Sequence, residues 1–270
     1  MVPNLDSVHG KIERAEFHAK TLFDEINLWL QSNPFEIRKV VNGDSTRYSI
    51  IAYLVGTEPP IKRWTLMVGD CVHNLRCALD HLVYAIAVHE SEKEPPPDER
   101  TLMFPITDTP ENFIANDFRI ASLSDPVKRA IEGVQPFKRP HTALPPILGL
   151  IRDYDNVDKH RLLRMANASI GEGDITLEGT SNTPGNNPTF IPFTKEALQD
   201  KDELFAAVFA LPAPNLRFSK VDVDMLIALF HRRRDSSDPP SAERSECITL
   251  MKQLIAEVKE VVGLVSAAVV

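Results

Sequence analysis

The sequence predicts a mainly α-helical α+β protein: an up-and-down bundle of about four long helices with an inserted β-hairpin and a small β-rich insertion before the last helix. Three observations predict this fold class. Apolar residues recur at alternating steps of three and four over long stretches, an Asn-Gly pair separates two β-prone runs, and a later segment mixes Gly, Asn and Pro with short β-prone runs. With 270 residues and 43% hydrophobic composition, the chain can bury a large core. We therefore expect one helical-bundle domain over residues 1–270, with insertions at 34–57 and 169–225.

Four segments have the spacing of long amphipathic helices, in which one face is apolar. They are residues 5–29, about 61–89, about 146–165 and about 241–268. Asn33-Pro34 ends the first segment, because proline cannot continue a helix. Shorter helices are expected at 110–117 and at 125–133.

The hairpin is predicted from "FEIRKVV" and "RYSIIAYLVG", which flank Asn42-Gly43. This pair tolerates the positive φ angles that a tight hairpin turn requires. The later runs "ELFAAVFAL" and "LRFSKVDVDML" are strand-like and predict a small sheet within 169–225.

Composition excludes some classes of function. A formal charge of −8 and a pI near 5.5 provide no basic field for indiscriminate binding of nucleic acid, so any such contact has to be local. The three cysteines include no C-x-x-C pair and favour a reducing cytoplasm. The longest apolar run, Val261 to Val270, has 10 residues, whereas a membrane-spanning helix needs about 20. We expect a cytoplasmic protein without a membrane segment.

The stretch "HNLRCALDH", residues 73–81, carries the main candidate site. At about 100° per residue, its short polar side chains form one face with those just before it. Residues 64–88 contain no Lys and no Glu, the residues that usually cover a solvated helix face. We therefore expect this face to lie half-buried against another element. Its members are Asp70, His73, Asn74, Cys77, Asp80, His81 and Tyr84.

A second polar stripe lies in "RDYDNVDKHRLLR", where Asp153, Asn156, His160 and Arg164 follow one another at steps of three, four and four. If the two helices pack together, polar stripe meets polar stripe. Such stripes also occur where histidines simply bond carbonyls and carboxylates inside a bundle, and the sequence leaves both interpretations open.

Arg76 and His81 form an R-x4-H motif that resembles the HEPN superfamily, whose ribonucleases carry R-x4-6-H on a helix of a helical bundle. The longer pattern, "GDCVHNLRCALDHL" followed by "DNVDKHRLL", also resembles a group of uncharacterised actinobacterial and phage proteins with similar HNLRSALDHL and DKHR stretches.

The HEPN resemblance implies metal-independent RNA cleavage of the toxin or defence type, in which the ribose 2′-hydroxyl attacks the adjacent phosphate. His81 would transfer the proton and Arg76 would stabilise charge on the phosphate oxygens. Asp70, His73, Asn74, Asp80, Asp153, Asn156 and His160 would support the site or bind substrate. The resemblance further implies RNA as substrate, a homodimer and a cognate antitoxin, with no metal or other cofactor.

Two other classes of function stay open. One is a non-enzymatic, dimeric helical protein that binds a ligand or regulates a partner. The other is a metal-dependent enzyme in which His73, His81 and His160 act with Asp70, Asp80 or Asp153, although the chain lacks the H-x-x-x-H and E-x-x-H spacings that place two ligands on one helix face. Whether the protein is an enzyme is not decided by the sequence.

Overall fold

A computed structural model of the protein describes residues 2–139, 146–160, 163, 165, 169–179, 183–193, 198–231 and 243–269. The chain divides into two compact units. A helical unit comprises Met1–Phe23, Lys62–Arg164 and Phe230–Val270, and a β-rich unit comprises Asp24–Ile61 and Met165–Leu229.

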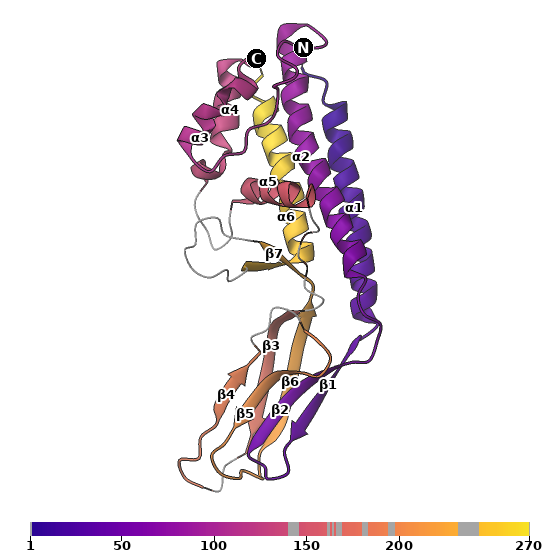
Figure 1. The fold of residues 1–270 in the computed structure, drawn as a ribbon, viewed down its shortest axis with the longest axis vertical. Helices are drawn as coiled ribbons and strands as arrows, with labels where there is room; N and C mark the ends of the chain where they lie inside the picture. The colour runs from indigo at the N-terminus through magenta and orange to yellow at the C-terminus, as the bar shows by residue number, and fades with distance from the viewer. Residues whose placement is uncertain are drawn as a thin grey trace. The chain divides into compact units, whose positions relative to one another are not determined.

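Three long helices run side by side in the helical unit (Figure 1): α1 (Asp6–Gln31), of which the first part belongs here, α2 (Ile61–Ser91) and α6 (Cys247–Ser266). Their apolar seams are fully buried, as at Leu75, Leu82 and Val258. The Lys259 ammonium of α6 lies 2.5 Å from the Glu16 carboxylate of α1 at the rim of this packing. The regular three-four spacing thus produces helices whose apolar faces meet.

Shorter elements complete this unit. They are α3 (Pro110–Ala115), the 3-10 helix η1 (Asp117–Ile120), α4 (Asp125–Gly133), the 3-10 helix η2 (Pro136–Lys138) and α5 (Ile147–Asp158). The buried extended segment before α3 is held by Gln135, whose side chain accepts a hydrogen bond from the Thr107 N–H and donates one to the Pro105 carbonyl, each at 2.9 Å. This segment contacts α2 through Phe104, whose backbone bonds the side chains of Arg76 and Asp80.

The β-rich unit contains a four-stranded antiparallel sheet of order β1-β2-β5-β4. Its strands are β1 (Phe35–Val41), β2 (Arg47–Leu54), β4 (Thr189–Pro192) and β5 (Asp202–Val208). A second ladder pairs β3 (Ser169–Glu178) with β6 (Arg217–Leu226). The buried Tyr48 ring contacts Phe209 and Phe218 edge to face, so aromatic packing joins β2 to β6. A short pair, β7 (Ala228–His231) and β8 (Glu243–Glu246), precedes α6.

The turn between β1 and β2 is longer than the Asn-Gly pair predicts. The positive φ falls at Ser45, with 58°, and neither Asn42 nor Gly43 has one. The Asn42 side chain instead accepts hydrogen bonds from the N–H groups of Thr46 and Arg47, at 2.9 and 2.8 Å. The asparagine therefore acts through its side chain, as in an Asx turn, and the residue that takes the left-handed conformation lies further along.

The predicted up-and-down bundle of four long helices is wrong. The described residues combine helices with a four-stranded antiparallel sheet and a two-stranded ladder, and the β1–β2 hairpin is part of the larger sheet because β2 also pairs with β5. The third predicted helix ends at Asp158 instead of continuing to Met165, and α5 runs across the direction of α2 and α6 rather than along it (Figure 1). Periodicity identifies an apolar face, but it does not report which partner that face meets or where tertiary contacts end the helix.

Candidate functional site

The two polar stretches of sequence meet in one contact between α2 and α5. Nδ1 of His73 lies 3.1 Å from Oδ1 of Asp155. The Asp155 side chain is 3% exposed and that of His73 is 54% exposed, so a buried carboxylate holds a solvent-facing imidazole. Because an ionised carboxylate only accepts hydrogen bonds, Nδ1 carries the proton and Nε2 is the acceptor nitrogen.

The second oxygen of the same carboxylate binds a cation. Nζ of Lys159, at the end of α5, lies 2.7 Å from Oδ2 of Asp155, and the Lys159 side chain is half-exposed. One buried carboxylate thus positions both an imidazole and an ammonium group at the protein surface. A proton acceptor and a positive charge side by side can take a proton from a substrate and stabilise negative charge that develops on it.

Cys77 lies one helical turn beyond His73, and its Sγ is 3.5 Å from Nε2 of that imidazole. Burial raises the pKa of the Cys77 thiol, and the charge of Lys11 opposes this shift. The thiol therefore keeps its proton at neutral pH. Cys77, His73 and Asp155 form a chain of proton donor, proton acceptor and orienting carboxylate.

Gly69 of α2 lies against the Asp158 side chain of α5. A Cβ atom at this position would lie 2.2 Å from Oδ1 of Asp158. Burial, followed by the negative charges of Asp70 and Asp155, raises the pKa of Asp158. The space beside Gly69 is thus filled by the end of the Asp158 side chain, and carboxylates gather on this side of His73.

Asp70 and Asn74 lie at the edge of the polar face. The Asp70 side chain is 62% exposed, and its Oδ2 is 3.9 Å from Nδ1 of His18 on α1. Nδ2 of Asn74 donates a hydrogen bond of 2.8 Å to the Asp70 carbonyl of its own helix. Asp70 and His73 are exposed, whereas Asn74, Cys77, Asp80 and His81 are half-buried, so the predicted burial of this face is found at four of these six residues.

Arg76 is committed to internal contacts. Its Nη2 donates to Oδ1 of Asp80 and to the Phe104 carbonyl, both at 2.8 Å, while the Phe104 N–H donates to the same Asp80 oxygen at 2.8 Å. The Arg76 side chain is 11% exposed, and its Nη1 is buried without a hydrogen-bond partner. The guanidinium ties α2 to the segment before α3, so phosphate binding by Arg76 would require these contacts to break.

His81 is partly exposed on α2. Burial lowers its pKa, the positive charge of Lys11 lowers it further, and Asp80 opposes both. The imidazole is therefore neutral at physiological pH and able to accept a proton. Asp80 itself has its pKa raised by burial and lowered in part by Arg76.

The second predicted stripe is only partly at the site. Asp153 accepts a hydrogen bond of 2.9 Å from Nε of Arg152, and Asn156 is exposed. His160 is exposed and follows the end of α5, so it no longer shares a helix face with them. Arg164 lies outside the described residues.

The sequence interpretation missed Asp155 and Lys159. Asp155 continues the buried series Leu148 and Ile151 at helical spacing, which makes it a carboxylate on the apolar face of α5. A buried carboxylate requires a hydrogen-bonding partner, and that is the signal that could have identified Asp155 as the residue that holds His73.

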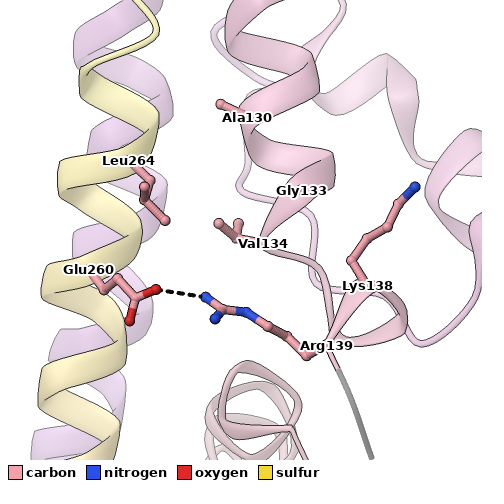
Figure 2. Close-up of a pocket in the computed structure, with 7 residues that line it drawn as sticks. All are labelled: Ala130, Gly133, Val134, Lys138, Arg139, Glu260 and Leu264. Atoms are coloured by element: carbon pink, nitrogen blue, oxygen red, sulfur yellow. Dashed lines mark hydrogen bonds and ion pairs between the residues drawn. The ribbon is translucent and has the colours of Figure 1, made fainter.

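A separate, open cavity of about 460 Å³ lies between α4, η2 and α6. In Figure 2, Arg139 reaches across its floor to Glu260, 3.1 Å away, and Val134 and Leu264 line its walls. None of the predicted site residues lines this cavity.

Within the part of the chain that the structure describes, no three His, Cys, Asp or Glu side chains are placed to hold a metal ion. None of the described helices has both the length and the apolar character needed to cross a membrane. Comparison with protein-family models, curated proteins and solved structures finds no match for this chain.

Proposed function

We propose that the α2–α5 site cleaves RNA without a metal ion, with His73 as the proton-transfer group in place of the Arg76–His81 pair. The observation that carries the proposal is the solvent-facing imidazole of His73 on the buried carboxylate of Asp155. The class of reaction comes from the HEPN resemblance, and the residue roles come from the geometry.

In this reaction the ribose 2′-hydroxyl replaces the Cys77 thiol at Nε2 of His73, gives its proton to that nitrogen and attacks the adjacent phosphorus. The bond to the 5′-oxygen breaks, which leaves a 2′,3′-cyclic phosphate, and the departing 5′-oxygen takes a proton from solvent to become a 5′-hydroxyl. Asp155 stabilises the imidazolium that forms, as a carboxylate partner does for a catalytic histidine. The ammonium of Lys159, which shares that carboxylate, is placed to stabilise the phosphorane oxygens.

A substrate that brings its own nucleophile fits this site better than an acyl substrate. Acyl transfer needs N–H donors for an oxyanion, and the backbone N–H groups around His73 lie in the interior of the 31-residue helix α2, where they bond within the helix. RNA cleavage needs a proton acceptor and a cation, which His73 and Lys159 supply. The carboxylates of Asp70 and Asp158 weaken phosphate binding, so we expect a high KM that rises with salt.

The test is cleavage of a labelled single-stranded RNA in EDTA. We expect His73→Ala to lower the rate by on the order of 10²–10⁴, the usual contribution of a general base. His9→Ala, which removes an exposed histidine of α1, is the matched control and should retain the rate. His81→Ala separates the two assignments, because it should leave the rate within about a factor of a few if His73 is the base.

Loss of cleavage in His81→Ala with full activity in His73→Ala would return the proton transfer to the R-x4-H motif. Wild-type protein that binds RNA or another ligand without cleaving it would favour the non-enzymatic alternative. The homodimer, the cognate antitoxin and the cytoplasmic location stay predictions from the sequence.

A further inference from the structure

The three cysteines occupy different environments. Cys71 and Cys247 are buried, and burial raises the pKa of Cys71 to about 12 and that of Cys247 further. Cys77 is partly exposed and has the Nε2 atom of His73 within 3.5 Å. Of the three thiols, that of Cys77 is therefore both accessible to solvent and in contact with a base.

Asp155 makes this base available to the thiol. Because the carboxylate accepts a hydrogen bond from the Nδ1–H group of His73, the lone pair of Nε2 points toward Sγ of Cys77. The thiol is protonated at rest, so reaction of the sulfur at neutral pH depends on proton removal by His73. The arrangement has the nucleophile, base and orienting group of covalent catalysis in order.

We propose that Cys77 is a thiol–disulfide exchange site for small, positively charged disulfides. His73 takes the thiol proton, the Cys77 sulfur attacks one sulfur of the disulfide, and the S–S bond of the reagent breaks. The products are a mixed disulfide on Cys77 and one free thiol, which receives the proton from His73. The electron pair of the broken S–S bond leaves with the departing sulfur, so the Cys77 sulfur is oxidised from thiol to disulfide level and the departing sulfur is reduced to a thiol.

The preference for a cation follows from the charges around the sulfur. Two carboxylates act on Cys77, Asp80 from its own helix and Asp155 from α5, against the cations Lys11 and Arg76. Arg76 pairs with Asp80 and Lys159 pairs with Asp155, so these four charges largely cancel. The carboxylates of Asp70 on α2 and Asp158 on α5 then outnumber the remaining cation, Lys11. A dicationic disulfide is attracted to such a surface, and an anionic one is repelled.

The consequence for activity rests on the proposed function. A substituent on Sγ occupies the space in front of Nε2 of His73, so the mixed disulfide should stop RNA cleavage until a reductant removes it. The exchange chemistry itself does not depend on that activity.

The experiment follows adduct formation on the intact protein by mass spectrometry at neutral pH. The probes are cystamine (dicationic), hydroxyethyl disulfide (neutral) and glutathione disulfide (anionic), and we expect rates in that order. Cys77→Ser should abolish the fast adduct, and His73→Ala should slow it about tenfold or more, with His9→Ala as the unaffected control. As the pH approaches the raised pKa of the thiol, the wild-type and His73→Ala rates should converge, because hydroxide then ionises Cys77 directly.

An equal rate for His73→Ala at neutral pH, or a fast adduct that persists in Cys77→Ser, would overturn the proposal. So would a rate order that follows anionic before cationic probes. Cleavage measured on the same samples keeps the two proposals apart. If the protein forms the adduct but has no ribonuclease activity, the exchange site is supported and the proposed function is rejected. If the protein cleaves RNA but forms no adduct, the proposed function is supported and the exchange site is rejected.

Discussion

Nδ1 of His73 and Oδ1 of Asp155 lie 3.1 Å apart, although 81 residues separate them in the chain between positions 73 and 155. This contact joins the polar stripe of α2 to the apolar face of α5. It brings the imidazole, the Lys159 ammonium and the Cys77 thiol to one place on the helical unit.

Asp155→Asn tests the orienting role of the carboxylate. The amide has nearly the same shape but carries no charge and can donate, so it no longer stabilises an imidazolium or enforces the Nδ1-protonated tautomer. We expect RNA cleavage to fall by on the order of 10² or more while the protein stays folded by circular dichroism. Asp153→Asn on the same helix is the matched control, and an equal loss there would contradict a specific role of Asp155.

Arg76→Ala tests whether Arg76 is structural. Removing the guanidinium leaves the Asp80 carboxylate without its cation and the Phe104 carbonyl without a donor. We expect a loss of about 3–5 kcal/mol in the free energy of unfolding, measured by urea denaturation, as when one partner of a buried ion pair is deleted. Arg14→Ala, at an exposed position of α1, should change it little. An Arg76→Ala protein of unchanged stability that no longer cleaves RNA would assign Arg76 to catalysis.

Gly69→Ala tests the close packing of α5 on α2. The new methyl group would lie 2.2 Å from the Asp158 carboxylate, which must move. Because the atoms in the way are the end of one flexible side chain, we expect Gly69→Ala to gain less stability than the increment of about 0.5–1 kcal/mol that a Gly→Ala change in a helix brings. Adding Asp158→Ala should recover that gain. Gly10→Ala is the control. Its Cβ meets nothing within 4 Å in helix α1, so it should gain about 0.5–1 kcal/mol. Additive effects of Gly69→Ala and Asp158→Ala would argue against the contact.

His81 should make the stability depend on pH. Burial and Lys11 lower its pKa from the ordinary 6.5, so the unfolded chain binds a proton at a pH where the folded protein does not. As the pH falls below 6.5 toward the lowered pKa of His81, protonation of the unfolded chain therefore destabilises the folded protein. Above pH 6.5 the contribution of His81 to the free energy of unfolding is fully present. We expect His81→Gln to lose less stability than the wild type between about pH 7.5 and about pH 5.5 in urea denaturation. His9→Gln should follow the wild type, and a His81→Gln curve parallel to the wild type would refute the assignment.

Local pattern identified most of the elements. The three-four spacing located α1, α2 and α6, and the absence of Lys and Glu from residues 64–88 marked the α2 face that contacts α5. It did not reveal that α5 ends at Asp158 or that β2 pairs with β5, because both depend on partners far away in the chain. The HEPN resemblance grouped Arg76 with His81, whereas in the structure the Arg76 guanidinium donates to the Phe104 carbonyl.

By itself, the sequence determined which residues could be helical and which polar groups were crowded onto α2, since helix formation and amphipathicity depend on neighbours within a few positions. Only the tertiary structure decided that Asp155 is the carboxylate beside His73. It also decided that the Arg76 guanidinium donates hydrogen bonds to Asp80 and Phe104. A hydrogen bond between distant residues depends on where the packed helices place them, and that geometry is set by burial of the whole core rather than by any local spacing.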